Sequence, residues 1–209
     1  RLVSVLAAQN EVGTVQPTAE VAAICDAAGV PLLVDGTQAV GRLGRDWTRA
    51  GWDYLVISAH KLRAPRGAAA LVHRGRAPEP LPLILGGSQE RGRRGGTEAV
   101  AAIMALGFAC ELAGRGELIQ PEALLARRTH FEAALSQIPG VEILAKDVER
   151  LPQTTALTVL GGDSEALLAG LDLAGICASS GSACSSGALT PSHVLAAMGV
   201  PEERSRGRL

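Results

Sequence analysis

Residues 2–35 read LVSVLAAQNEVGTVQPTAEVAAICDAAGVPLLVD and place two short apolar runs around an amphipathic stretch. The run Leu2–Ala8 is typical of a strand, Thr18–Ala28 has the apolar spacing of a helix that Gly29 ends, and Leu32–Val34 predicts a second strand. Strand, helix and strand in this order form a βαβ unit, in which the two strands are parallel. The sequence therefore predicts an α/β fold with a mainly parallel sheet.

Two polar residues follow the strands of this unit. Asn10 comes after the first strand, and Asp35 ends the second. Ligands of open α/β sheets bind beyond the carboxyl ends of the parallel strands. We therefore expect Asn10 and Asp35 to lie at one edge of the sheet and to face the same ligand, although an aspartate there is equally typical of an ordinary turn.

The sheet continues in two further runs, and a lysine lies between them. Tyr54–Ile57 and Ala68–Val72 have the composition of strands, and they are separated by SAHKLRAPRG at 58–67. The proline and glycine of that segment indicate a turn. Lys61 is therefore expected in a connection that follows a strand.

A loop and a long helix follow. Residues 86–96, GGSQERGRRGG, contain little apolar surface and predict a loop. We expect a helix from Thr97 to Ala113 with Thr97 as its N-cap. The best candidate for a domain boundary lies at 114–120.

We predict two domains, 1–118 and 119–209. The second has α+β character, because helical and strand-like patterns alternate irregularly along it. Its predicted helices are Pro121–Gln137, Ser164–Leu171 and Ser192–Met198, the last with Thr190 as cap and Pro191 at its first position, and its predicted strands are Val141–Leu144 and Thr155–Leu160.

The composition argues against several classes of protein. The chain of 209 residues is 47% hydrophobic and 2% aromatic, and its net charge is −1. A near-neutral chain without aromatic stacking surface is not typical of a protein that binds nucleic acid directly or lies on a membrane, and the arginines of the 86–96 loop have no interleaved aromatics. No run approaches the roughly 18 apolar residues that cross a bilayer.

The four cysteines show no close pairing, so they do not indicate the disulfide framework of a secreted protein. A reducing, cytoplasmic setting is expected. Cys25, Cys110 and Cys177 lie in apolar patterns and are predicted to belong to the core. Cys184 instead lies in SSGSACSSG, a run of small residues that is typical of a linker except for the thiol at its centre. The histidines show no metal-ligand spacing, so no metal site is predicted.

Lys61 is one of only two lysines among the 20 Lys and Arg residues. An amine, unlike a guanidinium, can lose its proton and bind a carbonyl carbon covalently. A single lysine is most often a surface residue. However, the Lys61 amine, the Asp35 carboxylate and the Cys184 thiol together suit pyridoxal phosphate chemistry. In that chemistry a lysine holds the cofactor and a carboxylate keeps its pyridine nitrogen protonated. Ser58 and His60 beside Lys61 suit the cofactor's phosphate.

As a set, these residues resemble the cysteine desulfurases of the NifS/IscS type, in the class V branch of the fold-type I pyridoxal phosphate enzymes. The resemblance is carried, in the family's order and at about its spacings, by AAQNEVGTVQP, LLVDGTQAVG, SAHKLRAPRGAAALV, GGSQERGRRGGTEAV and ASSGSACSSGALTPSHVLAAMGV. The motif SSGSAC marks the first of the family's two groups. The resemblance implies the fold of the type I pyridoxal phosphate-dependent transferases, with 1–118 as the C-terminal part of the cofactor-binding large domain and 119–209 as most of a smaller α+β domain that carries the catalytic cysteine loop.

The resemblance also implies a role for each candidate residue. Lys61 would hold the cofactor, and Cys184 would be the nucleophile that forms a persulfide. The remaining cofactor contacts would come from Asp35 at the pyridine nitrogen, Gln38 at the phenolic oxygen, Ser58 and His60 at the phosphate, Thr97 at the phosphate of the neighbouring subunit in a homodimer, and Asn10 near the ring and the substrate carboxylate.

The implied reaction converts L-cysteine to L-alanine and transfers the sulfur to an acceptor protein for iron–sulfur cluster assembly or tRNA thiolation. The chain resembles about the central half of such an enzyme, because the family's ring-stacking histidine and its substrate-binding arginine fall outside it. Two alternatives stay open at this point. Another class V enzyme, an aminotransferase or a selenocysteine or cysteine-sulfoxide lyase, would need Lys61 and Asp35 but not Cys184, and a non-catalytic fragment would need none of the three.

Overall fold

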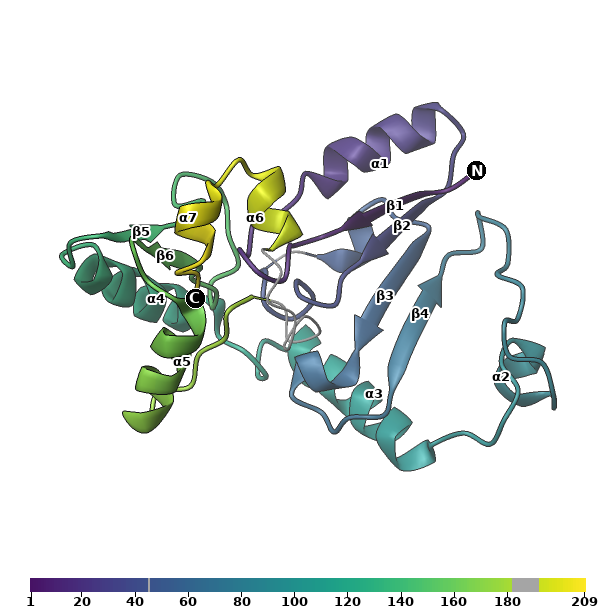
Figure 1. The fold of residues 1–209 in the computed structure, drawn as a ribbon. Helices are drawn as coiled ribbons and strands as arrows, with labels where there is room; N and C mark the ends of the chain where they lie inside the picture. The colour runs from purple at the N-terminus through teal and green to yellow at the C-terminus, as the bar shows by residue number, and fades with distance from the viewer. Residues whose placement is uncertain (45, 182–191) are drawn as a thin grey trace. The chain divides into compact units, whose positions relative to one another are not determined.

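A computed structural model describes residues 1–44, 46–181 and 192–209 (Figure 1). Contacts between residues divide the chain into two compact units. The first unit contains Arg1–Ala7 and Gln16–Gln120, and the second contains Ala8–Val15 and Pro121–Leu209. The predicted domains, 1–118 and 119–209, place residues 8–15 in the first domain rather than the second, and they stay a prediction.

The first unit is built on a four-stranded sheet with the strand order β1-β2-β3-β4 (Figure 1). The strands β1 (Val3–Leu6), β2 (Leu32–Asp35) and β3 (Tyr54–Ser58) are parallel. β4 (Ala69–His73) is antiparallel to β3, because the short connection between them reverses the chain. The predicted parallel arrangement is therefore confirmed for three strands, and the whole sheet is mixed.

Helix α1 (Thr18–Ala27) crosses from β1 to β2 and completes the predicted βαβ unit. Its buried residues are Thr18, Ala22 and Cys25, which are spaced by three or four and therefore lie on one face of the helix. Gly29 ends the helix with a φ of 61°, and its N–H bonds to the Asp26 carbonyl at 3.1 Å. Glycine takes this left-handed conformation without steric cost, which confirms the predicted helix end.

The core of the first unit lies between the sheet and the segments that follow β2 and β3. A short 3₁₀ helix, η2 (Ala59–Leu62), follows β3, and α3 (Val100–Gly114) packs against it. Apolar residues of β2, β3 and these segments are buried, namely Leu32, Val34, Ala39, Leu55, Ile57, Ala59, Leu62 and Leu106. Ala59 and Leu62, the first and last residues of η2, are both buried, so both ends of this helix lie in the core.

Two short elements interrupt the connections of the first unit. η1 (Trp47–Arg49) precedes β3, and α2 (Gln89–Gly92) lies within the predicted 86–96 loop. α2 is irregular, since both of its central residues have positive φ values. Helix α3 begins at Val100 rather than at the predicted Thr97. The N-cap of α3 is Ala99, whose backbone is not helical, so the predicted N-cap Thr97, two residues earlier, is wrong.

The second unit has an antiparallel sheet of β5 (Val141–Ile143) and β6 (Leu157–Val159). Its helices are α4 (Pro121–Leu135), α5 (Ser164–Leu173), α6 (His193–Ala197) and α7 (Glu202–Ser205). Leu157 and Leu209 exchange two backbone hydrogen bonds of 2.9 Å, so the end of the chain lies beside β6. The α+β character of this region agrees with the prediction.

Side-chain caps begin two helices of the second unit. Asp163 caps α5 by accepting from the N–H groups of Glu165 and Ala166 at 3.1 and 3.0 Å. Ser192 caps α6 by accepting from the N–H of Leu195 at 3.3 Å. The predicted cap for this helix, Thr190, lies outside the described residues, and its role falls to Ser192.

The three described cysteines differ in burial. Cys25 is buried as predicted, and Cys110 is half-buried. Cys177 is exposed, so its predicted place in the core is wrong; it lies in the irregular segment that follows α5. Within the described residues, no helix combines the length and the apolar composition that a membrane span requires.

Candidate functional site

Asp35 is the last residue of β2, and it is half-buried. Its Oδ1 accepts a hydrogen bond of 2.9 Å from the backbone N–H of Thr37. An aspartate that accepts from the N–H two residues later stabilises a turn. The N–H of Gly36 donates to the carbonyl of Val56 on β3 at 2.9 Å. The carboxylate is thus held at the carboxyl end of β2, directly beside β3.

Ser58 ends the neighbouring strand β3. The parallel register pairs Asp35 with Val56, so Ser58 lies two residues farther along, or about 6–7 Å in strand geometry. The Oγ of Ser58 lies 3.0 Å from Nδ1 of His60. Ser58 is half-buried and His60 is exposed. A hydroxyl and an imidazole therefore form a hydrogen-bonded pair at the same edge of the sheet as Asp35.

Lys61 lies in η2, one residue after His60, and it is half-buried. The next residue, Leu62, is 2% exposed and fixes the end of η2 in the core. Arg63 then takes a left-handed conformation with a φ of 60°, which ends the 3₁₀ helix. The backbone of Lys61 is therefore anchored on both sides, while its side chain lies at the boundary with solvent.

Gln38 lies in the turn that follows Asp35, and Arg42 connects this turn to Lys61. The Nη1 of Arg42 donates to the carbonyl of Gln38 at 3.2 Å. The Nη2 of the same guanidinium donates to the carbonyl of Lys61 at 2.6 Å. One side chain thus joins the two loops that carry the predicted residues.

The structure gathers five of the eight predicted residues at the carboxyl edge of β2 and β3, namely Asp35, Gln38, Ser58, His60 and Lys61. Thr97 belongs to the same unit and is exposed, three residues before α3. Asn10 belongs to the second unit, and the expectation that it faces the same ligand as Asp35 stays a prediction. Cys184 lies outside the described residues.

Asn10 is exposed in a tight turn of the second unit. The side-chain carbonyl of Gln9 accepts from the N–H groups of Glu11 and Val12 at 2.5 and 2.8 Å. The backbone closes the turn, since Gly13 donates to the Gln9 carbonyl at 3.0 Å. These contacts fix the backbone on both sides of Asn10.

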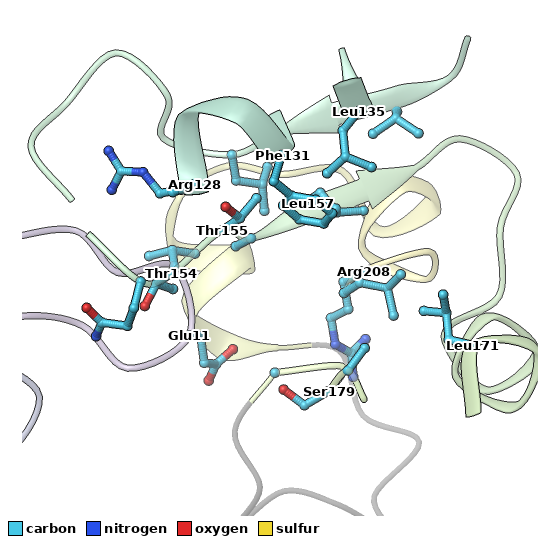
Figure 2. Close-up of a pocket in the computed structure, with 18 of the residues that line it drawn as sticks. Glu11, Arg128, Phe131, Leu135, Thr154, Thr155, Leu157, Leu171, Ser179 and Arg208 are labelled. Atoms are coloured by element: carbon cyan, nitrogen blue, oxygen red, sulfur yellow. The ribbon is translucent and has the colours of Figure 1, made fainter. Parts of the chain in front are cut away.

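The second unit also contains a cavity of about 970 Å³ (Figure 2). Apolar side chains from α4, β6 and α5 form much of its wall, including Phe131, Leu135, Leu157 and Leu171. Polar groups at the cavity include Asn10, Glu11, Thr154, Thr155, Ser179 and Arg208. The Nε of Arg208 donates to the carbonyl of Ser180 at 2.8 Å. Among the described residues, the lining includes Asn10 of the predicted site but none of the five residues gathered in the first unit.

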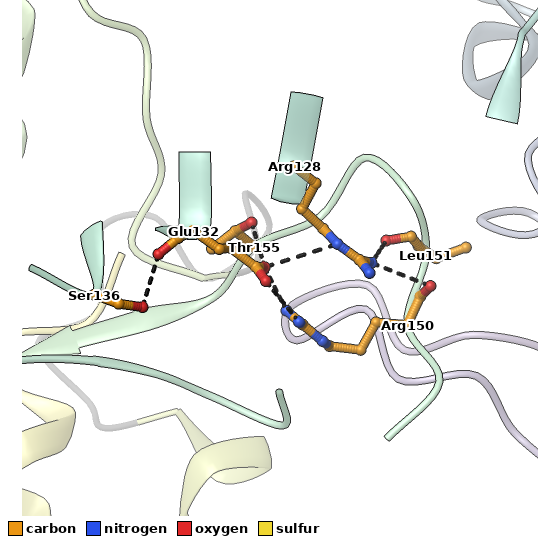
Figure 3. Close-up of polar contacts among 6 residues, drawn as sticks. All are labelled: Arg128, Glu132, Ser136, Arg150, Leu151 and Thr155. Carbon is orange, nitrogen blue, oxygen red and sulfur yellow. Dashed lines mark hydrogen bonds and ion pairs between the residues drawn. The ribbon is translucent and has the colours of Figure 1, made fainter. Parts of the chain in front are cut away.

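A buried ionic cluster holds α4 to the segment before β6 (Figure 3). Arg150 donates from Nη1 and Nη2 to the two carboxylate oxygens of Glu132 at 2.7 and 2.9 Å, and Thr155 donates to Glu132 at 2.8 Å. Arg128 donates to the Leu151 carbonyl at 2.5 Å. Burial opposes ionisation of Glu132, but the hydrogen bonds from Arg150 and Thr155 and the charges of both arginines outweigh it, so the pKa of Glu132 is lowered.

Sequence reasoning missed Arg42 and the cluster of Glu132 and Arg150. The pair Arg128 and Glu132 has the spacing of four that predicts contact on a helix. Nothing in the local pattern indicates that Arg150, 18 residues after Glu132, completes the cluster. Among the described residues, no group of three or more His, Cys, Asp or Glu side chains could hold a metal ion.

Known proteins resemble the chain over its whole length. A family described as Aminotransferase class-V matches residues 1–201. A cysteine desulfurase from Nostoc sp. is 43% identical over 213 residues, which cover 100% of this chain and 52% of the relative. The cysteine desulfurase NifS of Azotobacter vinelandii is 41% identical, over 99% of this chain and 51% of that protein.

Solved structures agree with these relatives. The X-ray structure of a NifS-like protein from Rickettsia africae superposes with a TM-score of 0.89 at 35% identity, and the match covers 99% of this chain and 54% of that one. This likeness confirms the predicted fold class. The chain spans about half the length of the curated relatives that it matches. By the match of its residues 1–201, the chain belongs to the aminotransferase class-V family.

Proposed function

We propose that the protein containing this chain is a pyridoxal phosphate-dependent cysteine desulfurase. It would convert L-cysteine to L-alanine and hold the released sulfur as a persulfide on Cys184. The names of the relatives support this activity, because both curated proteins compared above are cysteine desulfurases. The observation that carries the proposal is the gathering of Asp35, Ser58, His60 and Lys61 at the ends of two adjacent parallel strands.

The residues at this edge fit the cofactor by their chemistry. A half-buried amine at Lys61 is suited to covalent attachment, and a carboxylate at Asp35 is suited to the pyridine nitrogen. The hydrogen-bonded pair of Ser58 and His60 offers donors for a phosphate, and Gln38 would donate to the phenolic oxygen. Bound there, pyridoxal phosphate supplies a ring that takes up negative charge from the substrate's α-carbon.

The chain's own groups would then move protons and sulfur. Lys61 Nζ would remove the α-proton of L-cysteine, and the Asp35 carboxylate would accept a hydrogen bond from the ring nitrogen. The Sγ of Cys184 attacks the sulfur of L-cysteine, so that a sulfur–sulfur bond forms and the substrate's carbon–sulfur bond breaks. The bonding pair stays with the β-carbon, which takes up a proton, the α-carbon regains the proton that Lys61 removed, and L-alanine leaves. Cys184 would react as the thiolate, so either its surroundings favour the thiolate form or a neighbouring group accepts its proton.

Further parts of the proposal concern the whole enzyme. Asn10 would lie near the ring and the substrate carboxylate, and Thr97 would reach the phosphate of the neighbouring subunit in a homodimer. The persulfide would pass to an acceptor protein, either an iron–sulfur scaffold or a carrier for tRNA thiolation, in the cytoplasm. Neither direct binding to nucleic acid nor attachment to a membrane forms part of this function.

The roles of Lys61 and Cys184 are separable by experiment. The wild-type protein should develop a visible absorption band when pyridoxal phosphate is added, and it should form alanine and persulfide from cysteine. Lys61→Ala should lose the covalent attachment and reduce alanine formation by about 10²–10⁴-fold. Cys184→Ser should keep the visible band but form no persulfide. Persulfide formation by Cys184→Ser, or an unchanged band in Lys61→Ala, would refute the assignment.

A further inference from the structure

Arg42 occupies the junction between the two loops that carry the proposed cofactor site. Its guanidinium donates to the carbonyls of Gln38 at 3.2 Å and Lys61 at 2.6 Å, and it lies 3.5 Å from the carbonyl of Thr37. Thr37 and Gln38 belong to the turn after β2, whereas Lys61 belongs to η2 after β3. The contacts therefore join segments that are 19 residues apart in the sequence.

The chemistry of an arginine suits this junction. A guanidinium is planar and presents several N–H donors in fixed directions, so it constrains the acceptors it binds more than a single ammonium does. Burial lowers the pKa of Arg42, and the positive charge of Arg63 lowers it further. Arginine nevertheless stays protonated at neutral pH, because its ordinary pKa lies so far above 7. Its hydrogen bonds to the two carbonyls are therefore charge-assisted, which makes them stronger than neutral ones.

Close packing joins the same two loops at a second point. Gly41 has a φ of 76°, and a Cβ at this position would lie 2.8 Å from Cδ2 of Leu62. Leu62 directly follows Lys61 and is 2% exposed. The turn after β2 thus lies directly against η2, and the contact requires glycine. Arg42 adds directional hydrogen bonds to this apolar contact.

We propose that Arg42 is a positioning residue that holds the backbone of Lys61 in a fixed place relative to the turn bearing Asp35 and Gln38. Arg42 does not touch substrate in this role, and it acts through the Lys61 carbonyl. The inference rests on the proposed function, because it concerns the lysine that would hold pyridoxal phosphate. Without Arg42, the Lys61 carbonyl loses its 2.6 Å partner, while the apolar contact of the turn with η2 at Gly41 stays.

The test compares Arg42→Ala, Arg42→Lys and the control Arg66→Ala in the protein produced from the reading frame that contains these 209 residues. Arg66 is an exposed arginine of the connection that follows η2. Two quantities are measured: hydrogen exchange of peptides covering 36–43 and 59–64 in the absence of cofactor, and the affinity for pyridoxal phosphate from its visible absorption. Lys61→Ala serves as the reference for lost covalent attachment.

In Arg42→Ala, the backbone amides of both peptides should exchange hydrogen about ten-fold faster. The variant should also bind pyridoxal phosphate about ten-fold more weakly. Arg42→Lys should recover part of both losses, because an ammonium keeps the charge and can donate to the Lys61 carbonyl but does not bridge the two carbonyls as a guanidinium does. Arg66→Ala should match the wild type. Wild-type exchange and affinity in Arg42→Ala would overturn the inference, and so would a loss of affinity that Arg42→Lys does not recover even in part.

The proposed function fails on a different result. If the wild-type protein and Lys61→Ala respond identically to pyridoxal phosphate, Lys61 does not hold the cofactor, and the function is refuted. The exchange measurement on the cofactor-free protein still decides whether Arg42 joins the two loops. The two failures are therefore distinguishable.

Discussion

Arg150 and Glu132 form a two-point ion pair, with Nη1 2.7 Å from Oε1 and Nη2 2.9 Å from Oε2. Their side chains are 3% and 15% exposed, so the charges lie largely outside solvent. The backbone N–H of Val15 donates to the carbonyl of Glu149 at 2.9 Å, and the backbone N–H of Leu151 donates to the carbonyl of Gly13 at 2.8 Å. The pair therefore connects α4, through the backbone beside Arg150, to the turn that carries Asn10.

Removing one partner of this pair should destabilise the second unit. Glu132→Ala leaves the Arg150 guanidinium buried without its carboxylate, which should lower the free energy of unfolding by about 3 kcal/mol. Glu202→Ala is the control, because Glu202 pairs with Arg206 on the surface with side chains 66% and 71% exposed, and its loss should cost no more than about 0.5 kcal/mol. Denaturant unfolding measures both. Equal effects of the two substitutions would contradict the prediction.

The stability that Glu132 contributes should depend on pH. Its pKa is lowered in the folded chain from an ordinary value of 4.5, so its contribution is complete above about pH 4.5 and is lost as the pH falls through the lowered pKa. The difference in unfolding free energy between the wild type and Glu132→Gln should therefore shrink from pH 6 to pH 3. Urea unfolding at several pH values measures this difference. A difference that grows on acidification would rule out the assigned cause.

Gly41 should be far less replaceable than Gly44, three residues away. An alanine at 41 must take a φ of 76° and place its Cβ against the buried Leu62, which should cost about 1–3 kcal/mol. At Gly44 no heavy atom lies within 4 Å of an added Cβ, so Gly44→Ala should be within about 0.5 kcal/mol of the wild type. Thermal unfolding of the two variants gives the comparison, and a neutral Gly41→Ala would show that the loop packing is wrong.

The three described cysteines should differ in their reactivity toward iodoacetamide. Cys177 is exposed and should be alkylated first. Burial raises the pKa of Cys110, which lowers its thiolate fraction, and Cys25 is buried. Peptide mass spectrometry after brief labelling of the Cys184→Ser protein measures the order without the fourth thiol. Faster labelling of Cys25 than of Cys177 would contradict the described burial.

Local sequence predicted most elements of the fold, because the relevant signals are short-range. The apolar run around Val3 and the one ending at Asp35 form the two parallel strands, and Gly29 ends the helix between them. Thr97 shows where such reasoning fails. A threonine before an apolar run is a common N-cap, but the backbone becomes helical only at Val100.

The candidate site divides in the same way. The strand ends at Asp35 and Ser58 are visible in the sequence, and the parallel register then brings them to one edge. The hydrogen bond from Arg42 to the Lys61 carbonyl is not visible in the sequence, because it depends on how two loops pack against each other.

The sequence by itself determined the βαβ unit, the place of Lys61 immediately after a strand, and the family resemblance, since each follows from residues that are close together or from their order along the chain. Only the tertiary structure decided that residues 8–15 pack with the second unit, that Cys177 is exposed, and that Arg42 and Arg150 are partners of distant groups. The physical reason is that burial and long-range hydrogen bonds depend on which surfaces meet when the whole chain folds, and no local pattern encodes that choice.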